Sequence, residues 1–259
     1  MLQMSSTSVE PSLDSANRLW LDMMQAAVWL DVPVKTVVLQ RGQVLTEEGQ
    51  IAASVVFPEG ALLADLAYMN DGRMIEVSAV GRDGAAHLLC ALAMEPAPHR
   101  SVVKIGGAAK VVKASSVRAA VQSDPALAKR IMSWLQKRAV DSEQAIACSL
   151  MHDATQRLAR ALLLTRDRTG SDQLPLTQDD FATTLGVQRT TLNASALQLK
   201  ADGAIRYSRG MLRVLDADSL AARACECHAR VDLRQSGPTA PDGSSGPRAD
   251  GALRVVSRT

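Results

Sequence analysis

The sequence predicts an α+β fold in which an antiparallel jelly-roll β-barrel is followed by a long helix and a compact unit of helices with a β-hairpin. Short β-branched segments divided by turn residues occupy residues 36–114. A stretch with helical spacing begins at Asp124-Pro125, and a helix-start signal precedes a glycine turn within residues 177–214. The chain of 259 residues has the length of roughly two domains.

Composition restricts the functional classes that fit the chain. The net charge is only +2, but residues 154–214 hold nine Lys and Arg against five Asp and Glu, so any basic surface is local. Aromatic residues make up 3%, which argues against stacking on single-stranded bases. No signal segment and no apolar run of the ~18 residues needed to span a bilayer is found. With four cysteines, we expect a reduced cytoplasmic protein.

The N-terminal third is expected to begin with a helix over residues 15–30. Apolar side chains recur there at helical spacing, at positions 19, 20, 23, 24, 27, 28 and 30. The pattern then changes to short runs with β propensity, separated by turns rich in Gly, Asp and Pro. The expected strands are residues 36–39, 43–45, 54–57, 73–80, 101–105 and 110–114.

A long helix is expected from Pro125 to about residue 150, since proline is favoured in a first helical turn. Small and medium side chains recur along it, namely Ile131, Leu135, Ala139, Ser142, Ala145, Ile146 and Ser149. This stripe fits either the contact surface of a homodimer, which we favour, or a face packed on the barrel. The next helix should begin at Asp153, with Gln156 completing a capping box, and run to about residue 168.

Residues 177–214 carry the most informative motif. Thr177 and Asp180 form a helix-start signal, and Gly186 interrupts the helix after little more than two turns. A second helix should bury Leu192, Ala196 and Leu199 and end at residues 202–203. Two short helices joined by a glycine turn cross at a steep angle, so the second protrudes, as insertion into a DNA major groove requires.

The protruding face of the second helix is polar. Arg189 can form two parallel hydrogen bonds with guanine, and Gln188 or Asn193 can do the same with adenine. A β-hairpin over residues 205–215 would present Arg206, Ser208 and Arg209 to phosphates. The predicted DNA-binding residues are Thr177, Gln178, Gln188, Arg189, Thr190, Thr191, Asn193, Arg206, Ser208 and Arg209. The alternative is a helical packing module that binds no nucleic acid.

These motifs resemble the Crp/Fnr family of transcription regulators over most of residues 34–227. The C-terminal resemblance rests on RLARALLLTRDR, LTQDDFATTLGVQRTTL, GAIRYSRGMLRVLD and ACEC. A looser N-terminal resemblance rests on LQRGQVLTEEG, VVFPEG and DGRMIEVSAVGRDG, with the glycine pair at 106–107. The family implies a jelly-roll sensor domain, a long dimerisation helix and a winged helix-turn-helix.

The resemblance divides the chain into five parts. An N-terminal helical segment covers residues 1–33, and a cyclic-nucleotide-binding-like sensor domain covers residues 34–122. The dimerisation helix covers residues 123–151, and the winged helix-turn-helix covers residues 152–232. Residues 233–259 are too poor in apolar side chains to repay ordering and are expected to form a disordered tail.

The chain departs from the family where effectors bind. Family members that bind cyclic nucleotides carry Gly-Glu-Leu and a phosphate-binding Arg-Ser/Thr-Ala, whereas residues 81–84 read Gly-Arg-Asp-Gly and the nearest arginine motif is Arg100-Ser101-Val102. The iron–sulfur branch has N-terminal cysteines, whereas the first cysteine here is Cys90. The sequence therefore argues against cyclic AMP and against an iron–sulfur cluster, predicts no cofactor and leaves the effector unknown.

Cysteines and histidines near the C-terminus leave a metal site open. Cys148 and His152 are four residues apart on one helix, and Cys225, Cys227 and His228 follow the hairpin. Soft and imidazole ligands of this kind suit zinc, but the CxxC pairs of known structural sites are missing, so buried thiols are the favoured interpretation and no metal is predicted. No catalytic motif is found either, and the chain is not expected to be an enzyme.

The sequence therefore predicts an effector-responsive homodimer of Crp/Fnr type that regulates transcription by binding an inverted-repeat operator in double-stranded DNA. RNA polymerase is a further candidate partner, and no membrane association is expected. The alternative is a signal-binding or protein-interaction module whose helix-turn-helix no longer reads DNA. The operator, the regulated genes and the direction of regulation do not follow from the sequence.

Overall fold

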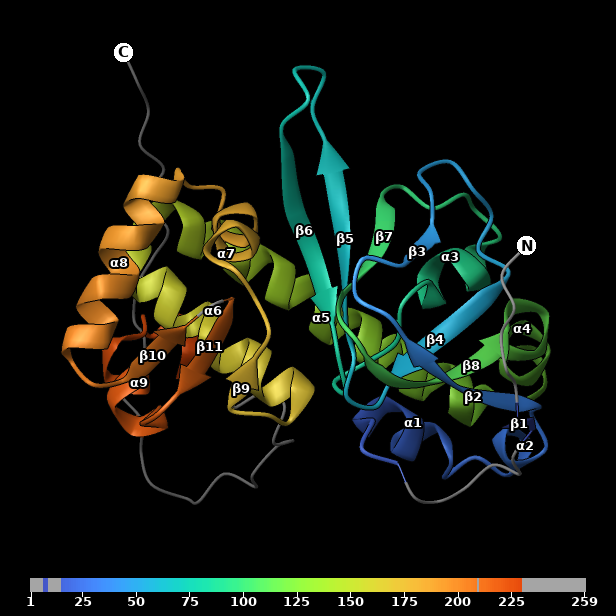
Figure 1. Ribbon diagram of the computed structural model, residues 1–259. Coiled ribbons are helices and arrows are strands. Elements are labelled where there is room, and N and C mark those ends of the chain that lie inside the picture. Colours follow the sequence, from blue (N-terminus) through green and yellow to red (C-terminus); the bar gives the residue numbers. More distant parts are fainter. Residues whose placement is uncertain (1–6, 9–14, 209, 230–259) are drawn as a thin grey trace, which may run out of the picture.

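The computed structural model describes residues 7–8, 15–208 and 210–229. A β-barrel with short helices lies on the right of Figure 1, and a smaller unit of helices and strands lies on the left. The long helix α5 passes behind them and reaches the smaller unit with its C-terminal end. No helix in the described part of the chain is both long and apolar enough to cross a bilayer.

The barrel consists of two four-stranded sheets whose pairings are all antiparallel. The first sheet has the order β1 (Thr7–Ser8), β2 (Val34–Leu39), β8 (Gly107–Lys113), β4 (Ser54–Pro58). The second has the order β3 (Val44–Thr46), β7 (Arg100–Ile105), β5 (Leu62–Tyr68), β6 (Met74–Val80). Apolar side chains from both sheets, such as Leu63 and Val56, meet in a shared core. The predicted α+β class is confirmed.

Three barrel strands differ clearly from the expectation, among them β1, which lies in the segment expected to be helical. Strand β5 was not predicted, because LLADLAY has no β-branched residue and no strict alternation, yet it is hydrogen-bonded to both β6 and β7. Strand β8 begins at Gly107 rather than Lys110, because its pairing with β2 extends to Leu39. The glycine pair at 106–107 is therefore partly strand and not only a separator.

The expectation of a single helix over residues 15–30 is wrong. Two short helices form instead, α1 (Arg18–Met23) and α2 (Ala27–Leu30). The break turns Trp29 into the core and leaves Leu30 45% exposed, the reverse of the expected face. Trp29 and Trp20 make edge-on contacts with Phe57 of β4, with ring centroids 6.0 and 5.1 Å apart. This aromatic cluster attaches both short helices to the barrel.

One short helix lies between the barrel strands β6 and β7, and two further helices connect the barrel to the C-terminal part of the chain. The helices α3 (Leu88–Ala93) and α4 (Ala114–Ser123) were not predicted, whereas α5 (Pro125–Met151) matches the expected long helix. Asp124 caps α5 by accepting hydrogen bonds from the amides of Ala126 and Leu127. In the predicted stripe, Ile131 is buried against the barrel, but Ile146 nearer the C-terminus is 63% exposed. Packing on the barrel thus accounts only for the N-terminal half of the stripe on α5.

The C-terminal unit contains α6 (Ala154–Thr169), α7 (Gln178–Leu185), α8 (Arg189–Ala201) and α9 (Ala217–Arg223). A three-stranded sheet, in the order β10 (Ile205–Ser208), β11 (Met211–Val214), β9 (Gln173–Leu174), completes it. The predicted capping boxes form at both Asp153–Gln156 and Thr177–Asp180. The elements β9 and α9 were not predicted. Arg209 and the predicted tail, residues 233–259, lie outside the described residues.

Candidate nucleic-acid interface

The turn between α7 and α8 fixes the direction of α8. Gly186 ends α7 in the left-handed conformation with φ 63°, which residues with a Cβ rarely adopt. The amide of Val187 then donates a hydrogen bond to the carbonyl of Ala182, 3.2 Å away. On α8, Leu192 and Leu199 are at most 1% exposed and pack into the core of the unit. One face of α8 is therefore held in the core, and the opposite face is directed outward.

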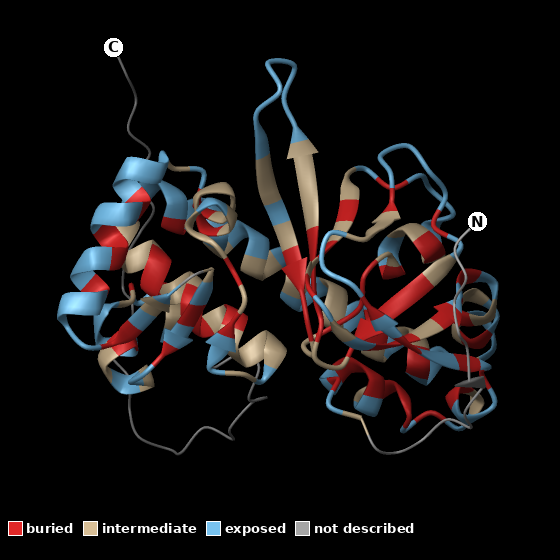
Figure 2. Cartoon of the chain, viewed as in Figure 1, coloured by how far each residue is buried: buried red, intermediate tan, exposed pale blue. Residues whose placement is uncertain are grey.

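The outward face of α8 carries the polar residues expected there. Its exposed face lies along the outer edge of the unit in Figure 2, away from the barrel. The residues with exposed side chains include the N-cap residue Gln188 and the four α8 residues predicted to contact DNA, which are Arg189, Thr190, Thr191 and Asn193. None of them is turned into the core, so the arrangement needed for contact with base edges is present.

Two of these side chains already have partners within the chain. Arg189 lies 3.3 Å from the carboxylate of Asp179 on α7, and both side chains are more than 60% exposed. The amide of Asn193 accepts a hydrogen bond of 3.1 Å from Gln178. Such exposed contacts are weak and can be exchanged for contacts with a ligand. Asp179 was not singled out in the sequence, where its only visible role was that of an acidic residue in a first helical turn.

The hairpin β10–β11 is attached to the start of α7. Tyr207 lies between the exposed residues Arg206 and Ser208. Its hydroxyl accepts a hydrogen bond of 3.0 Å from the backbone amide of Gln178. Thr177 is occupied by its capping box, because its hydroxyl lies 2.7 Å from the carboxylate of Asp180. Arg206 and Ser208 thus lie on the surface as expected, whereas Thr177 has a structural role that leaves its hydroxyl engaged.

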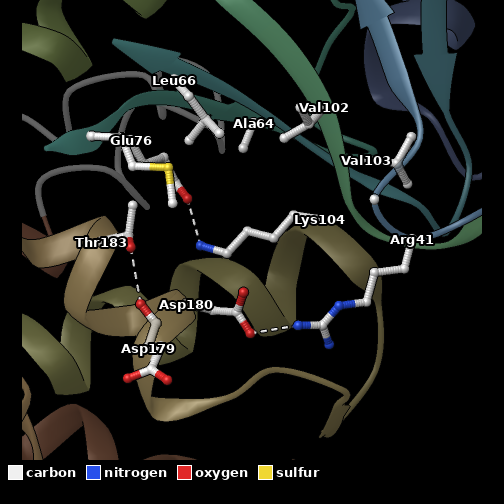
Figure 3. Close-up of a pocket in the computed structure, with 12 residues that line it drawn as sticks. Arg41, Ala64, Leu66, Glu76, Val102, Val103, Lys104, Asp179, Asp180 and Thr183 are labelled. Carbon is white, nitrogen blue, oxygen red and sulfur yellow. Dashed lines mark hydrogen bonds and ion pairs between the residues drawn. The ribbon is translucent and has the colours of Figure 1, made fainter. Parts of the chain in front are cut away.

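The C-terminal unit contacts the barrel through α7. Lys104 of β7 forms an ion pair with Glu76 of β6 and donates to the hydroxyl of Thr184 on α7, 2.5 Å away. Arg41 pairs with Asp180 across 2.7 Å. Figure 3 shows Lys104, Glu76, Arg41 and Asp180 around a cavity of about 240 Å³ between the barrel strands β5, β6 and β7 and helix α7. Arg41 also donates a hydrogen bond to the carbonyl of Pro175 just before α7, whereas the polar residues of α8 stay exposed.

A second contact joins the barrel loop of residues 81–84 to α6. Asp83 forms an ion pair of 2.9 Å with Arg168, and the backbone amide of Arg82 donates to the carbonyl of Arg168 across 2.9 Å. Burial alone would raise the pKa of Asp83, but Arg168 and Arg138 hold it below its usual value. The loop also fits tightly against α5, since a Cβ on Gly84 would lie 2.4 Å from the Trp134 ring. This loop, compared above with the Gly-Glu-Leu stretch of members that bind cyclic nucleotides, joins the barrel to α6.

A larger cavity of about 500 Å³ lies between the barrel and α5. Its polar groups include Arg138 from α5, Asp65 and Ser78 from the barrel, and His87 before α3. The Nε2 atom of His87 is buried without a hydrogen-bond partner, and burial lowers the pKa of this imidazole. Arg100 does not line the cavity, because it pairs with Glu47 across 3.1 Å. The arginine motif considered for a phosphate is thus engaged elsewhere.

Four of the five predicted metal-ligand candidates come together at the end of α5. Cys148, His152, Cys225 and Cys227 place their ligand atoms within 4.8 Å of one another, while His228 is not part of the group. Burial and the adjacent thiol of Cys148 raise the pKa of Cys225 to about 12. The expectation of simple buried thiols thus understated how closely these side chains meet.

Comparison with known proteins agrees with this arrangement. Residues 156–223 match the family of Crp-like helix-turn-helix domains. FixK2 from Bradyrhizobium japonicum has a similar structure, with a TM-score of 0.62 and 15% identity, covering 74% of this chain and 98% of that one. A putative Crp/Fnr-family regulator from Eubacterium rectale gives 0.60 and 17%, covering 80% and 98%. A Crp/Fnr-family regulator from Thermus thermophilus gives 0.58 and 20%, covering 73% and 97%.

No curated protein is significantly similar to the chain in sequence. The domain match and the shared fold nevertheless confirm the resemblance to Crp/Fnr transcription regulators. Because such regulators are not enzymes, the comparison also agrees with the expectation that this chain catalyses no reaction.

Proposed function

Since the chain carries a Crp-like helix-turn-helix domain within the fold of the Crp/Fnr transcription regulators, we propose that it binds an inverted-repeat DNA site as an effector-responsive homodimer. In this proposal, residues 34–122 form the sensor domain, residues 123–151 the dimerisation helix and residues 152–232 the DNA-binding domain. The protein would act on DNA in the cytoplasm, and RNA polymerase would be a candidate partner at the promoter.

The polar outward face of α8 is the observation that carries the proposal. Arg189 and Asn193 are exposed one helical turn apart and supply donors and acceptors that match guanine and adenine edges in the major groove. Exposed Arg206 on β10 adds a cation for the phosphate backbone. A module that only packed against other helices would have no reason to leave this combination of side chains uncovered.

The second half of α5 supports the homodimer. Ile146 and Leu150 are 63% and 77% exposed in the single chain, and neighbouring Met151 is 78% exposed. Apolar side chains gathered on one helix favour burial against a partner. Pairing of two α5 helices would place two copies of α8 about one turn of DNA apart, which matches an inverted repeat.

The cavity beside α5 supports regulation by a small effector. Its volume of about 500 Å³ is in the range of ligand pockets, and it combines apolar walls with a few polar groups. Arg138 lines this cavity and also acts electrostatically on Asp83, the partner of Arg168 in α6. One of the similar structures is described as a c-di-GMP-responsive regulator from Xanthomonas campestris. An anionic effector that attracts Arg138 would weaken its effect on the Asp83–Arg168 pair.

Selection of binding sites from random duplex DNA tests the proposal. The full chain should enrich an inverted repeat with half-sites separated by about one helical turn. Arg189→Ala should reduce the preference at one base pair in each half-site without abolishing binding to other sequences. Salt-sensitive binding without sequence enrichment would instead support a signal-binding or protein-interaction module, and the proposal would be abandoned.

A further inference from the structure

A compact group of sulfur and nitrogen ligands lies where α5 ends and α6 begins. Cys148 is in the last turn of α5, and His152 is the residue directly after that helix. Cys225 and Cys227 arrive from the segment that follows α9, more than 70 residues later in the sequence. Two parts of the chain that are far apart in sequence thus supply ligands to one point.

The distances between these atoms fit a single tetrahedral ion. The sulfur atoms of Cys148 and Cys225 are 3.5 Å apart, and the sulfur of Cys227 is 3.7 Å from Nδ1 of His152. A tetrahedral zinc ion with the usual bond lengths separates its ligand atoms by roughly 3.5–3.8 Å. All four ligand atoms lie within 4.8 Å of one another. An iron–sulfur cluster would need wider spacing, because its inorganic core lies between the cysteines.

The surroundings of the group resemble those of a metal site. The three cysteines are at most 3% exposed and form an apolar cluster of their own. Nε2 of His152 lies 3.1 Å from the carboxylate of Glu226, which orients the ring with Nδ1 toward the sulfur atoms. Gln144 donates a hydrogen bond to the sulfur of Cys227 across 3.1 Å. A carboxylate behind a histidine and an amide donor to a thiolate are typical partners of metal ligands.

We propose that Cys148, His152, Cys225 and Cys227 bind one divalent zinc-type ion. On binding, each cysteine releases its proton to solvent and the sulfur lone pairs form the metal bonds, so no oxidant or reductant is required. Three thiolates and one neutral imidazole form a closed, four-coordinate site with no open position for catalysis. The ion would join the end of α5 to the segment after α9 and so fix the C-terminal unit to the long helix.

Metal titration of the full chain tests this proposal directly. Protein purified under reducing conditions and treated with a chelator should bind about one Co²⁺ per chain, with the absorption bands of tetrahedral cobalt bound to thiolates. Zn²⁺ should displace the cobalt and abolish these bands. Reduced chain that binds neither ion would overturn the proposal. Two reactive thiols in place of four in the protein as purified, with a Cys148–Cys225 disulfide found by mass spectrometry, would also overturn it.

Two kinds of variant keep the result interpretable if a cysteine variant folds poorly. Cys225→Ser should lose the thiolate bands, whereas Cys90→Ser, which lies outside the group, should keep full stoichiometry. Glu226→Gln changes a carboxylate that is 69% exposed and leaves all four ligands in place. It should weaken metal binding by about 10–100-fold through the loss of histidine orientation. Equal cobalt binding by wild type and Cys225→Ser would mean that the ion binds elsewhere in the chain, and the proposed site would be wrong.

Discussion

Replacing Asp83 with Asn should reduce the free energy of unfolding by about 3 kcal/mol. Removal of one partner from a buried ion pair typically costs 3–5 kcal/mol, because the remaining charge stays buried without compensation. The side chains of Asp83 and Arg168 retain 14% and 20% exposure, which places the expected cost at the lower end. Two cations are affected, since Arg138 also interacts with Asp83.

Asp71→Asn provides a matched control for this variant. Asp71 pairs with Arg73 at 2.7 Å, a shorter distance than the 2.9 Å between Asp83 and Arg168. Its partner is 83% exposed, however, and exposed pairs contribute only about 0–1 kcal/mol. If burial determines how much an ion pair stabilises the fold, the longer Asp83–Arg168 pair must contribute more than the shorter Asp71–Arg73 pair.

Urea unfolding at several pH values measures both effects. Because the pKa of Asp83 is lowered in the folded chain, its contribution is fully present above the unfolded value and is lost as the pH falls. The difference in the free energy of unfolding between wild type and Asp83→Asn should therefore stay constant between about pH 5 and pH 8 and become smaller below about pH 4. Equal losses for the two variants, or a difference that does not narrow in acid, would refute the argument.

Three further predictions concern DNA binding, folding and assembly. Arg189→Ala should cost about 1–3 kcal/mol of binding free energy at one base pair, whereas Arg206→Ala should weaken binding to all duplexes alike and reduce the salt dependence of binding by about one released counterion. Titration with operators that carry single base substitutions distinguishes the two variants. Uniform losses of affinity for both would contradict these roles. Leu192→Ala should lower the free energy of unfolding by about 2–5 kcal/mol, because this 1% exposed side chain leaves a cavity. Ile146→Glu should give monomers in analytical ultracentrifugation, and a persistent dimer would exclude α5 as the dimer contact.

Local signals explain why helices α6, α7 and α8 were predicted well. The Thr177–Asp180 and Asp153–Gln156 capping boxes act between residues three apart, and the glycine turn at Gly186 depends on its own backbone conformation. Such signals are readable from sequence because the interacting groups are neighbours in the chain. The exposed face of α8 follows from the same helical period that buries Leu192.

The parts that were missed depend on distant partners. Strand β5 is defined by its pairing with β6 and β7 rather than by its own residues, whose propensity for strands is low. The loop of residues 81–84 was interpreted only as a turn that departs from the family's Gly-Glu-Leu stretch, because its partner Arg168 is 85 residues away. Cys148 and Cys225 were considered as ligands of one metal, but their close approach across 77 residues could not be deduced from spacing.

Helix α6 is held near both of its ends by groups outside the DNA-contacting elements. Near its C-terminal end Arg168 pairs with Asp83 of the barrel, and before its N-terminal end His152 belongs to the cysteine group. Because α6 packs against α7, α8 and α9, it carries the face that we propose for DNA contact. A change at either attachment would therefore reorient α8 without touching its polar residues. The two attachments are separated by the length of a 16-residue helix, about 24 Å, but both act on α8 through α6, so we expect changes at Asp83 and at the cysteine group not to be additive.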